Sequence, residues 1–69
     1  MIETPEDLIR PEVENFGADG NALSLVGSVA RELRRVGNTP EVVDAFRKEA
    51  LSGDYDHVVQ TCMAYAEVD

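Results

Sequence analysis

Hydrophobic residues recur at helical spacing from Asn21 to Val36, in the segment NALSLVGSVARELRRV, which is the longest such run in the chain. At about 100° per residue, the apolar side chains of this segment fall on one face. They are Ala22, Leu23, Leu25, Val26, Val29, Ala30, Leu33 and Val36. Asp19 or Asn21 can cap the first amides, and Gly37 is typical of the left-handed residue that ends a helix. The pattern predicts a helix over residues 21–36.

Two further amphipathic helices are predicted. Thr39-Pro40-Glu41 supplies a cap, a first-turn proline and an acid at the positive end of the helix dipole, so the second helix should span residues 40–51. Its buried stripe is Val42, Val43, Phe46 and Ala50. Asp54 should cap the third, over residues 55–66, with an apolar face of Tyr55, Val58, Val59, Cys62, Met63 and Ala66. The short connections favour a compact bundle of neighbouring helices.

The first twenty residues are predicted to form an extended arm. Thr4-Pro5 resembles a helix start, but Pro11 would stop that helix after one or two turns. Val13 and Phe16 are the expected anchors of the arm. Residues 12–16 and the C-terminal tail can also pair as a small two-stranded sheet, and the pattern leaves this open because such a pair is barely stable alone. The predicted fold is mainly α, a three-helix bundle in a single domain of residues 1–69, with an arm (1–20) and a helical body (21–69).

The formal net charge of −8 is concentrated at the two ends of the chain. Residues 1–20 hold six acids against one arginine, residues 54–69 hold four acids and no base, and the middle is close to neutral. Direct binding to nucleic acid is not expected from this balance, because phosphate-backbone binding needs a net basic face. One cysteine excludes an internal disulfide, and no apolar run or basic leader indicates a membrane span or signal peptide, so the cytoplasm is the expected location.

Candidate catalytic chemistry is sparse. Asp54, Asp56 and His57 form the one cluster of carboxylates and imidazole and could be considered as metal ligands. However, Asp54 is expected to cap the third helix, and the side chains of Asp56 and His57 point about 100° apart. Cys62 and His57 fall on different faces of one helix, so they are not expected to form a nucleophile and its base. No glycine-rich phosphate loop is present. We therefore expect no enzymatic activity, no metal and no cofactor.

The polar face of the first helix carries the candidate binding residues. Gly27 lies inside that helix, where glycine costs about 0.5–1 kcal/mol relative to alanine. Either another segment of the chain crosses closely there, or a ligand or partner lies against the gap. Arg31, Arg34 and Arg35 form a basic zone together with the more distant Arg47 and Lys48. Either the acidic arm lies across this zone, or its arginines are simply solvated, or the zone is a binding patch for nucleic acid or another partner.

Several short motifs resemble a family of small, uncharacterised bacterial and phage proteins. They are Asp19-Gly20-Asn21-Ala22, Gly27, Leu33-Arg34-Arg35, Glu49-Ala50 and Ser52-Gly53-Asp54-Tyr55-Asp56. The resemblance covers the chain from Asp19 to the C-terminus and implies an accessory protein encoded on mobile DNA, with no known activity. The expected function is non-catalytic binding of another protein, or of a second copy, through Gly27, Arg31, Arg34 and Arg35. The alternative is an acidic mimic of nucleic acid that occupies a DNA-binding protein.

Overall fold

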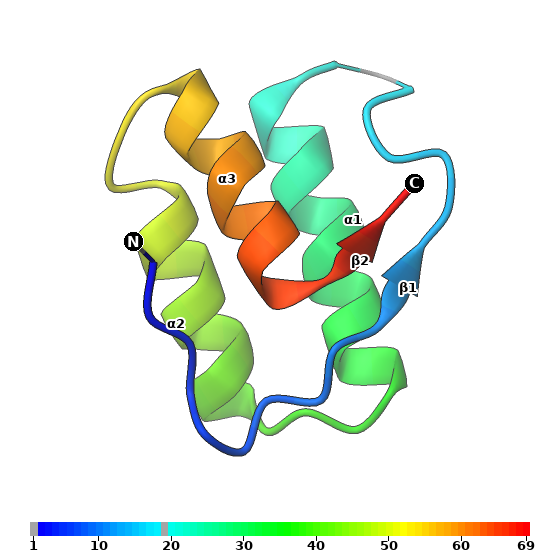
Figure 1. Cartoon of the computed structure of the whole chain (residues 1–69), viewed down its shortest axis with the longest axis vertical. Coiled ribbons are helices and arrows are strands. Elements are labelled where there is room, and N and C mark those ends of the chain that lie inside the picture. The colour runs from blue at the N-terminus through cyan, green and yellow to red at the C-terminus, as the bar shows by residue number, and fades with distance from the viewer. Residues whose placement is uncertain (1, 19) are drawn as a thin grey trace.

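The computed structural model describes residues 2–18 and 20–69, and it contains three helices and a pair of short strands (Figure 1). The helices are α1 (Ala22–Arg35), α2 (Pro40–Ala50) and α3 (Tyr55–Tyr65), and the strands are β1 (Glu12–Val13) and β2 (Glu67–Val68). All three helices pack against one another, as predicted. None of the helices in the described part of the chain has the length and apolar character needed to cross a membrane.

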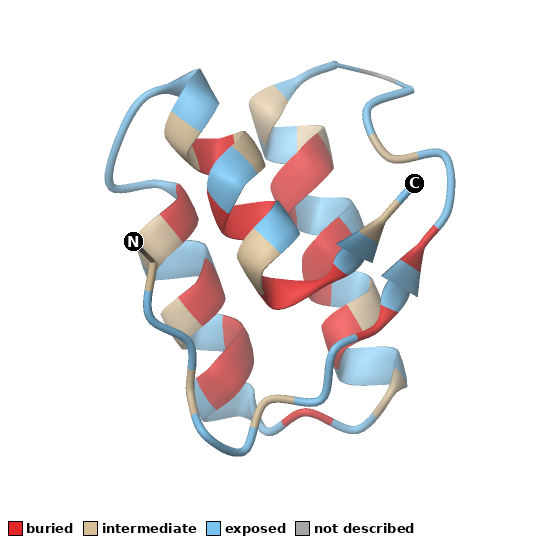
Figure 2. Ribbon diagram, in the orientation of Figure 1, coloured by how far each residue is buried: buried red, intermediate tan, exposed pale blue. Residues whose placement is uncertain are grey.

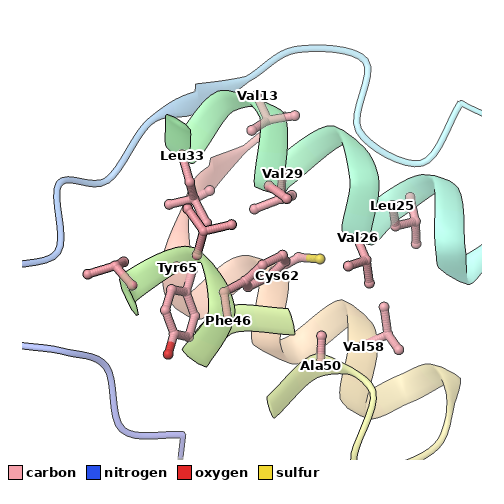
Figure 3. Packing of buried hydrophobic residues seen from close by; sticks show 14 residues of the cluster. Val13, Leu25, Val26, Val29, Leu33, Phe46, Ala50, Val58, Cys62 and Tyr65 are labelled. Atoms are coloured by element: carbon pink, nitrogen blue, oxygen red, sulfur yellow. The ribbon is translucent and has the colours of Figure 1, made fainter. Parts of the chain in front are cut away.

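The buried face of each helix points into one common core (Figures 2 and 3). Phe46 and Tyr65 meet edge to face at its centre, with ring centroids 5.2 Å apart and planes inclined by 61°. The other labelled core side chains in Figure 3 are Val13, Leu25, Val26, Val29, Leu33, Ala50, Val58 and Cys62. Val13 comes from β1, so the arm contributes to the core as predicted.

The helix ends follow the predicted capping residues. The side chains of Asn21, Thr39 and Asp54 accept hydrogen bonds from the first-turn amides of α1, α2 and α3. Asp19, the alternative cap of α1, lies outside the described residues. Gly37 has a φ of +102°, so it provides the left-handed conformation that ends α1.

Three predictions about individual faces are wrong. Leu23, Tyr55 and Met63 were assigned to apolar faces, but their exposed fractions are 68%, 48% and 53%. Thr61 is fully buried instead, because its hydroxyl donates to the carbonyl of His57 at 2.7 Å and so needs no water. The segment after Thr4-Pro5 forms a single turn, within the one or two turns predicted, and in it the Leu8 amide donates to the Pro5 carbonyl at 3.2 Å.

The arm and the tail form the small sheet, in parallel orientation. Glu12 is paired with Glu67 and Val13 with Val68. The Glu67 amide donates to the Pro11 carbonyl at 2.8 Å, and the arm continues alongside α1. Parallel strands require a long crossover, which the three helices provide. The helical core therefore supports a pair that would be marginal alone.

Two side chains fasten the arm to the helices. Asn38, in the loop between α1 and α2, accepts a hydrogen bond from the Ile9 amide at 2.8 Å and donates to the Ile9 carbonyl at 2.8 Å, so its side-chain amide pairs with the Ile9 backbone as a neighbouring strand would. Its NH₂ group also donates to the Leu33 carbonyl at 3.0 Å. Arg10 donates to the carbonyls of Met63 and Ala66 at the C-terminus of α3, at 2.8 and 3.0 Å. Neither role was predicted from the sequence.

Candidate functional site

Gly27 faces open space on the outer side of α1. Among residues 2–18 and 20–69, a Cβ atom built on this residue would meet nothing within 4 Å. The prediction that another segment of the chain crosses closely at Gly27 is therefore wrong. Packing within the protein does not explain a glycine in the middle of this helix.

A cleft of about 400 Å³ lies over Gly27, between α1 and the loop that follows β1. Its lining from the loop includes Asn15, which has a φ of +58°, and Gly17, with a φ of +84°. Ser28 and Arg31 line its floor on α1. These two residues also line a second cleft of about 400 Å³ that runs between β1 and α1 toward Arg35. The two clefts form one groove along the polar face of α1, and we call it the α1 groove.

The three candidate arginines are differently engaged. Arg35 forms an ion pair with Glu32, one turn before it, and the Arg31 guanidinium lies 3.9 Å from the same carboxylate. The Arg31 side chain is 80% exposed, and Arg31 lines both clefts of the α1 groove. Arg34 is exposed, and within residues 2–18 and 20–69 it forms no ion pair. Arg31 is therefore the cation best placed to receive an acidic group.

The predicted five-residue basic zone is divided in the structure. Arg34 and Arg35 lie in the last turn of α1, whereas Arg47 and Lys48 lie in the last turn of α2. Because α2 runs back alongside α1, these two turns lie at opposite ends of the bundle (Figure 1). Lys48 is also paired with Asp44, four residues before it on α2, at 3.1 Å.

The acidic arm lies beside the arginines rather than across them. Glu12 and Glu14 line the same cleft as Arg31 and Arg35, but in the described part of the chain no ion pair joins the arm to these arginines. The arm's own arginine, Arg10, is bound to Glu67 at 3.0 Å. The α1 groove therefore has a basic floor and an acidic flank.

A Glu-His-Ser cluster, which was not predicted from the sequence, joins α2 to α3. The His57 Nε2 atom lies 2.7 Å from the Glu49 carboxylate and 3.3 Å from the Ser52 hydroxyl. Both partners share one ring nitrogen, whereas a catalytic triad uses the two nitrogens separately. The Ser52 hydroxyl also donates to the Glu49 carbonyl at 2.7 Å. The cluster therefore joins the two helices and lacks the geometry of an activated nucleophile.

Gly53 is the signal that would have revealed this cluster. A Cβ atom on Gly53 would lie 2.9 Å from the Cβ of His57, so the imidazole can fold back over the loop only because residue 53 has no side chain. In the sequence this glycine reads as a loop residue, because its closeness to the Cβ of His57 depends on how the backbone of the loop turns into α3.

Cys62 and the acidic first turn of α3 show no features of a reactive centre. Burial raises the pKa of the Cys62 thiol to about 11, so the thiol stays protonated at neutral pH. Asp54 is used as the cap of α3, as predicted, with the His57 amide donating to it at 3.0 Å. Across residues 2–18 and 20–69, the acids, histidine and cysteine form no group of three that suits a metal ion.

Replacing Gly27 with alanine is expected to stabilise the fold by about 0.5–1 kcal/mol, because the new methyl group meets nothing and alanine has the higher helix propensity. Thermal unfolding should show a rise in Tm of about 2–8 °C. Gly37→Ala is the matched control, since its positive φ makes the same substitution unfavourable. A lower Tm for Gly27→Ala would show that packing does require this glycine.

The α1 groove is thus the site that the structure assembles from the predicted residues. It brings together Gly27, Arg31 and Arg35, while Arg34 lies beyond the residues that line it. Asn15, Ser28 and the two glutamates of the arm were not predicted as members, because their proximity depends on the path of the arm. The chain matches no protein-family model, no curated protein and no solved structure.

Proposed function

We propose that this chain is a cytoplasmic, non-catalytic protein that binds another protein along the α1 groove. The observation that carries the proposal is the open space at Gly27. A glycine there lowers the stability of α1, and the packing of the chain does not require it. A partner whose main chain approaches the helix closely would benefit from the missing side chain.

The charges of the groove support a polar partner surface. Arg31 is largely exposed at the point where the two clefts meet, and Arg34 is exposed one turn further along. In an interface, arginine can bind a carboxylate through two parallel hydrogen bonds and contributes strongly when water is excluded. The proposed role of Arg31 and Arg34 is to bind acidic side chains of the partner.

The test is quantitative affinity capture from the native host with two matched double variants. Arg31→Ala/Arg34→Ala removes two positive charges from α1, and Arg47→Ala/Lys48→Ala removes two from the far end of α2. We expect the α1 variant to recover at least about tenfold less partner, which corresponds to 1.4 kcal/mol or more. The α2 variant should recover as much as the unmodified protein.

Equal recovery by both variants would contradict the assignment of the site to α1. Equal loss from both would show that binding depends on overall charge, since the two variants carry the same net charge. Thermal unfolding of each variant ensures that the fold is retained. Purified partner should then bind the unmodified chain directly, without other components of the lysate.

A second candidate function rests on the acids that the strand pair brings together. Glu12, Glu14, Glu67 and Asp69 line one hollow of about 440 Å³ on the sheet. A mimic of nucleic acid would present such a surface to a basic, DNA-binding protein. In that case the captured partner would be basic, its binding would weaken steeply with salt, and the α1 variant would bind at least as well as the unmodified chain.

A further inference from the structure

We infer that the α1 groove binds its partner as an added strand, through an extended segment in which acidic and basic residues alternate. This inference rests on the proposed function and specifies the chemistry of the partner. It follows from the free edge of β1, from the charges on the two sides of the groove, and from the continuity of the groove with Gly27.

In the described part of the chain, no strand pairs with the outer edge of β1. The sheet has two strands, and β2 occupies one edge of β1 (Figure 1). The carbonyls of Pro11 and Val13 face β2, where they accept hydrogen bonds from Glu67 and Asp69 at 2.8 and 3.1 Å. Successive residues of a strand direct their backbone groups to alternate edges, so the amide and carbonyl of Glu12 face away from β2. They provide a donor and an acceptor for one further strand.

The charges beside this edge of β1 differ between the side that faces α1, which is basic, and the side that faces solvent, which is acidic. Arg31 and Arg35 lie on the α1 side of the cleft that Glu12 and Glu14 also line. The side chain of Val13 is buried toward the core, so that of Glu12, its neighbour in β1, points to the opposite, solvent-facing side. Side chains of an added strand alternate in the same way. Acidic residues facing α1 and basic residues facing outward would therefore match both sides.

The groove also fits the length of a short strand. It extends from Ser24 to Arg35 on α1, a helical rise of about 17 Å, which an extended chain of about five residues covers. The strand would leave the edge of β1 and continue over Gly27, where its main chain can lie close to the helix. An alternating segment carries little net charge, so it is not repelled by the net charge of −8.

The test uses two capped synthetic peptides of about six residues, one alternating glutamate and lysine and the other with the same residues in two blocks. Each is titrated into the ¹⁵N-labelled protein. The alternating peptide should bind at least about tenfold more tightly than the block peptide, or 1.4 kcal/mol. It should shift the amide signals of Glu12, Glu14 and the α1 residues from Gly27 to Arg35.

Two variants test the strand itself. Glu12→Pro removes the outward amide but keeps the Pro11 carbonyl that binds β2, whereas Glu12→Ala keeps the amide and removes the carboxylate. Glu12→Pro should lose at least about tenfold in affinity and Glu12→Ala much less. Ser28→Phe fills the groove where the two clefts meet, on an exposed position outside the strands, and it should also abolish binding.

The outcomes separate this inference from the proposed function. If both peptides bind alike and Glu12→Pro has no effect, the added strand is overturned, while loss of captured partner with Arg31→Ala/Arg34→Ala would still support binding at α1. If the captured partner is unaffected by the arginine variant, the proposed function fails at this site. If the Glu12 amide shifts with protein concentration in the absence of peptide, the edge pairs with a second copy and the inference is overturned.

Discussion

Replacing Asn38 with aspartate is expected to destabilise the fold by about 2–4 kcal/mol at neutral pH, since it removes two donated hydrogen bonds and adds a buried charge. The Asn38 amide donates to the carbonyls of Ile9 and Leu33, at 2.8 and 3.0 Å, and the residue is 9% exposed. In the variant, an ionised carboxylate would face both carbonyl oxygens. A domain of this length has a total stability of about 3–10 kcal/mol, so a substantial fraction would unfold.

The pH dependence of Asn38→Asp shows whether the introduced charge causes the destabilisation. Burial against two carbonyl oxygens should raise the pKa of the introduced carboxyl above its unfolded value of about 3.9. When the folded pKa is the higher one, the protonated form favours folding, and this contribution is lost as the pH rises through the folded pKa. The destabilisation relative to the unmodified chain should therefore be largest at neutral pH and shrink as the pH falls from the folded pKa toward about 4.

Urea unfolding at pH 3.5 and pH 7 measures this difference, and Asn38→Ala is the control. Alanine removes all three hydrogen bonds without adding a charge, so its cost of about 1–3 kcal/mol should vary little with pH. Hydrogen exchange at the Ile9 amide should accelerate in both variants, although a carboxylate can still accept from that amide. A pH-independent loss in Asn38→Asp would show that the hydrogen bonds, and not the charge, carry the effect.

The helices could be predicted because their determinants are local. Hydrophobic spacing, the caps Asn21, Thr39 and Asp54, and the terminator Gly37 each act within a few residues of the helix they define. The predicted ends over residues 21–36 accordingly differ from those of α1 by one residue at each end. The sequence left the pairing of the two strands open. Their stability depends on packing against the helices, which lie between the two strands in the sequence.

The attachment of the arm could not be predicted because its partners are distant in sequence. Asn38 follows Ile9 by 29 residues, and in the sequence it is simply the second residue after a helix. The same applies to Arg10, whose carbonyl partners lie in the last turn of α3 and just after it, more than fifty residues later. Hydrophobic periodicity carries no information on which side chain will meet which carbonyl.

Only the part of the candidate site that lies on α1 could be predicted, because its other residues come from the distant arm. Gly27 and Arg31 could be selected because a glycine and cations on a helix face are visible in the sequence. The α1 groove itself depends on the path of the arm, which positions Asn15 and Glu14 beside α1. Whether Gly27 faced a neighbour or open space required the packed structure.

Raising the pH from 9 to 11 is expected to destabilise the protein by about 2 kcal/mol through Cys62 alone. Burial raises the pKa of this thiol from 9.0 to about 11, so between these values the unfolded chain releases a proton that the folded chain retains. The stabilisation from keeping the thiol neutral is therefore complete below pH 9 and is lost as the pH rises to 11. Burial, and then the nearby Glu49 carboxylate, also raise the pKa of Tyr65 above 10.0, which extends the loss to higher pH.

Urea unfolding under reducing conditions from pH 7 to 11 should separate the two groups, using Cys62→Ala and Tyr65→Phe. Cys62→Ala should lose about 1 kcal/mol at pH 7 because it leaves a small cavity, yet its stability should fall less steeply between pH 9 and 11. Tyr65→Phe preserves the edge-to-face contact with Phe46 and should flatten the profile only above pH 10. Exposed groups titrate alike in all three proteins, so the differences between the profiles isolate the buried ones. Parallel profiles for Cys62→Ala and the unmodified chain would mean that water reaches the thiol, because only a solvated thiolate ionises in the folded state without a free-energy cost.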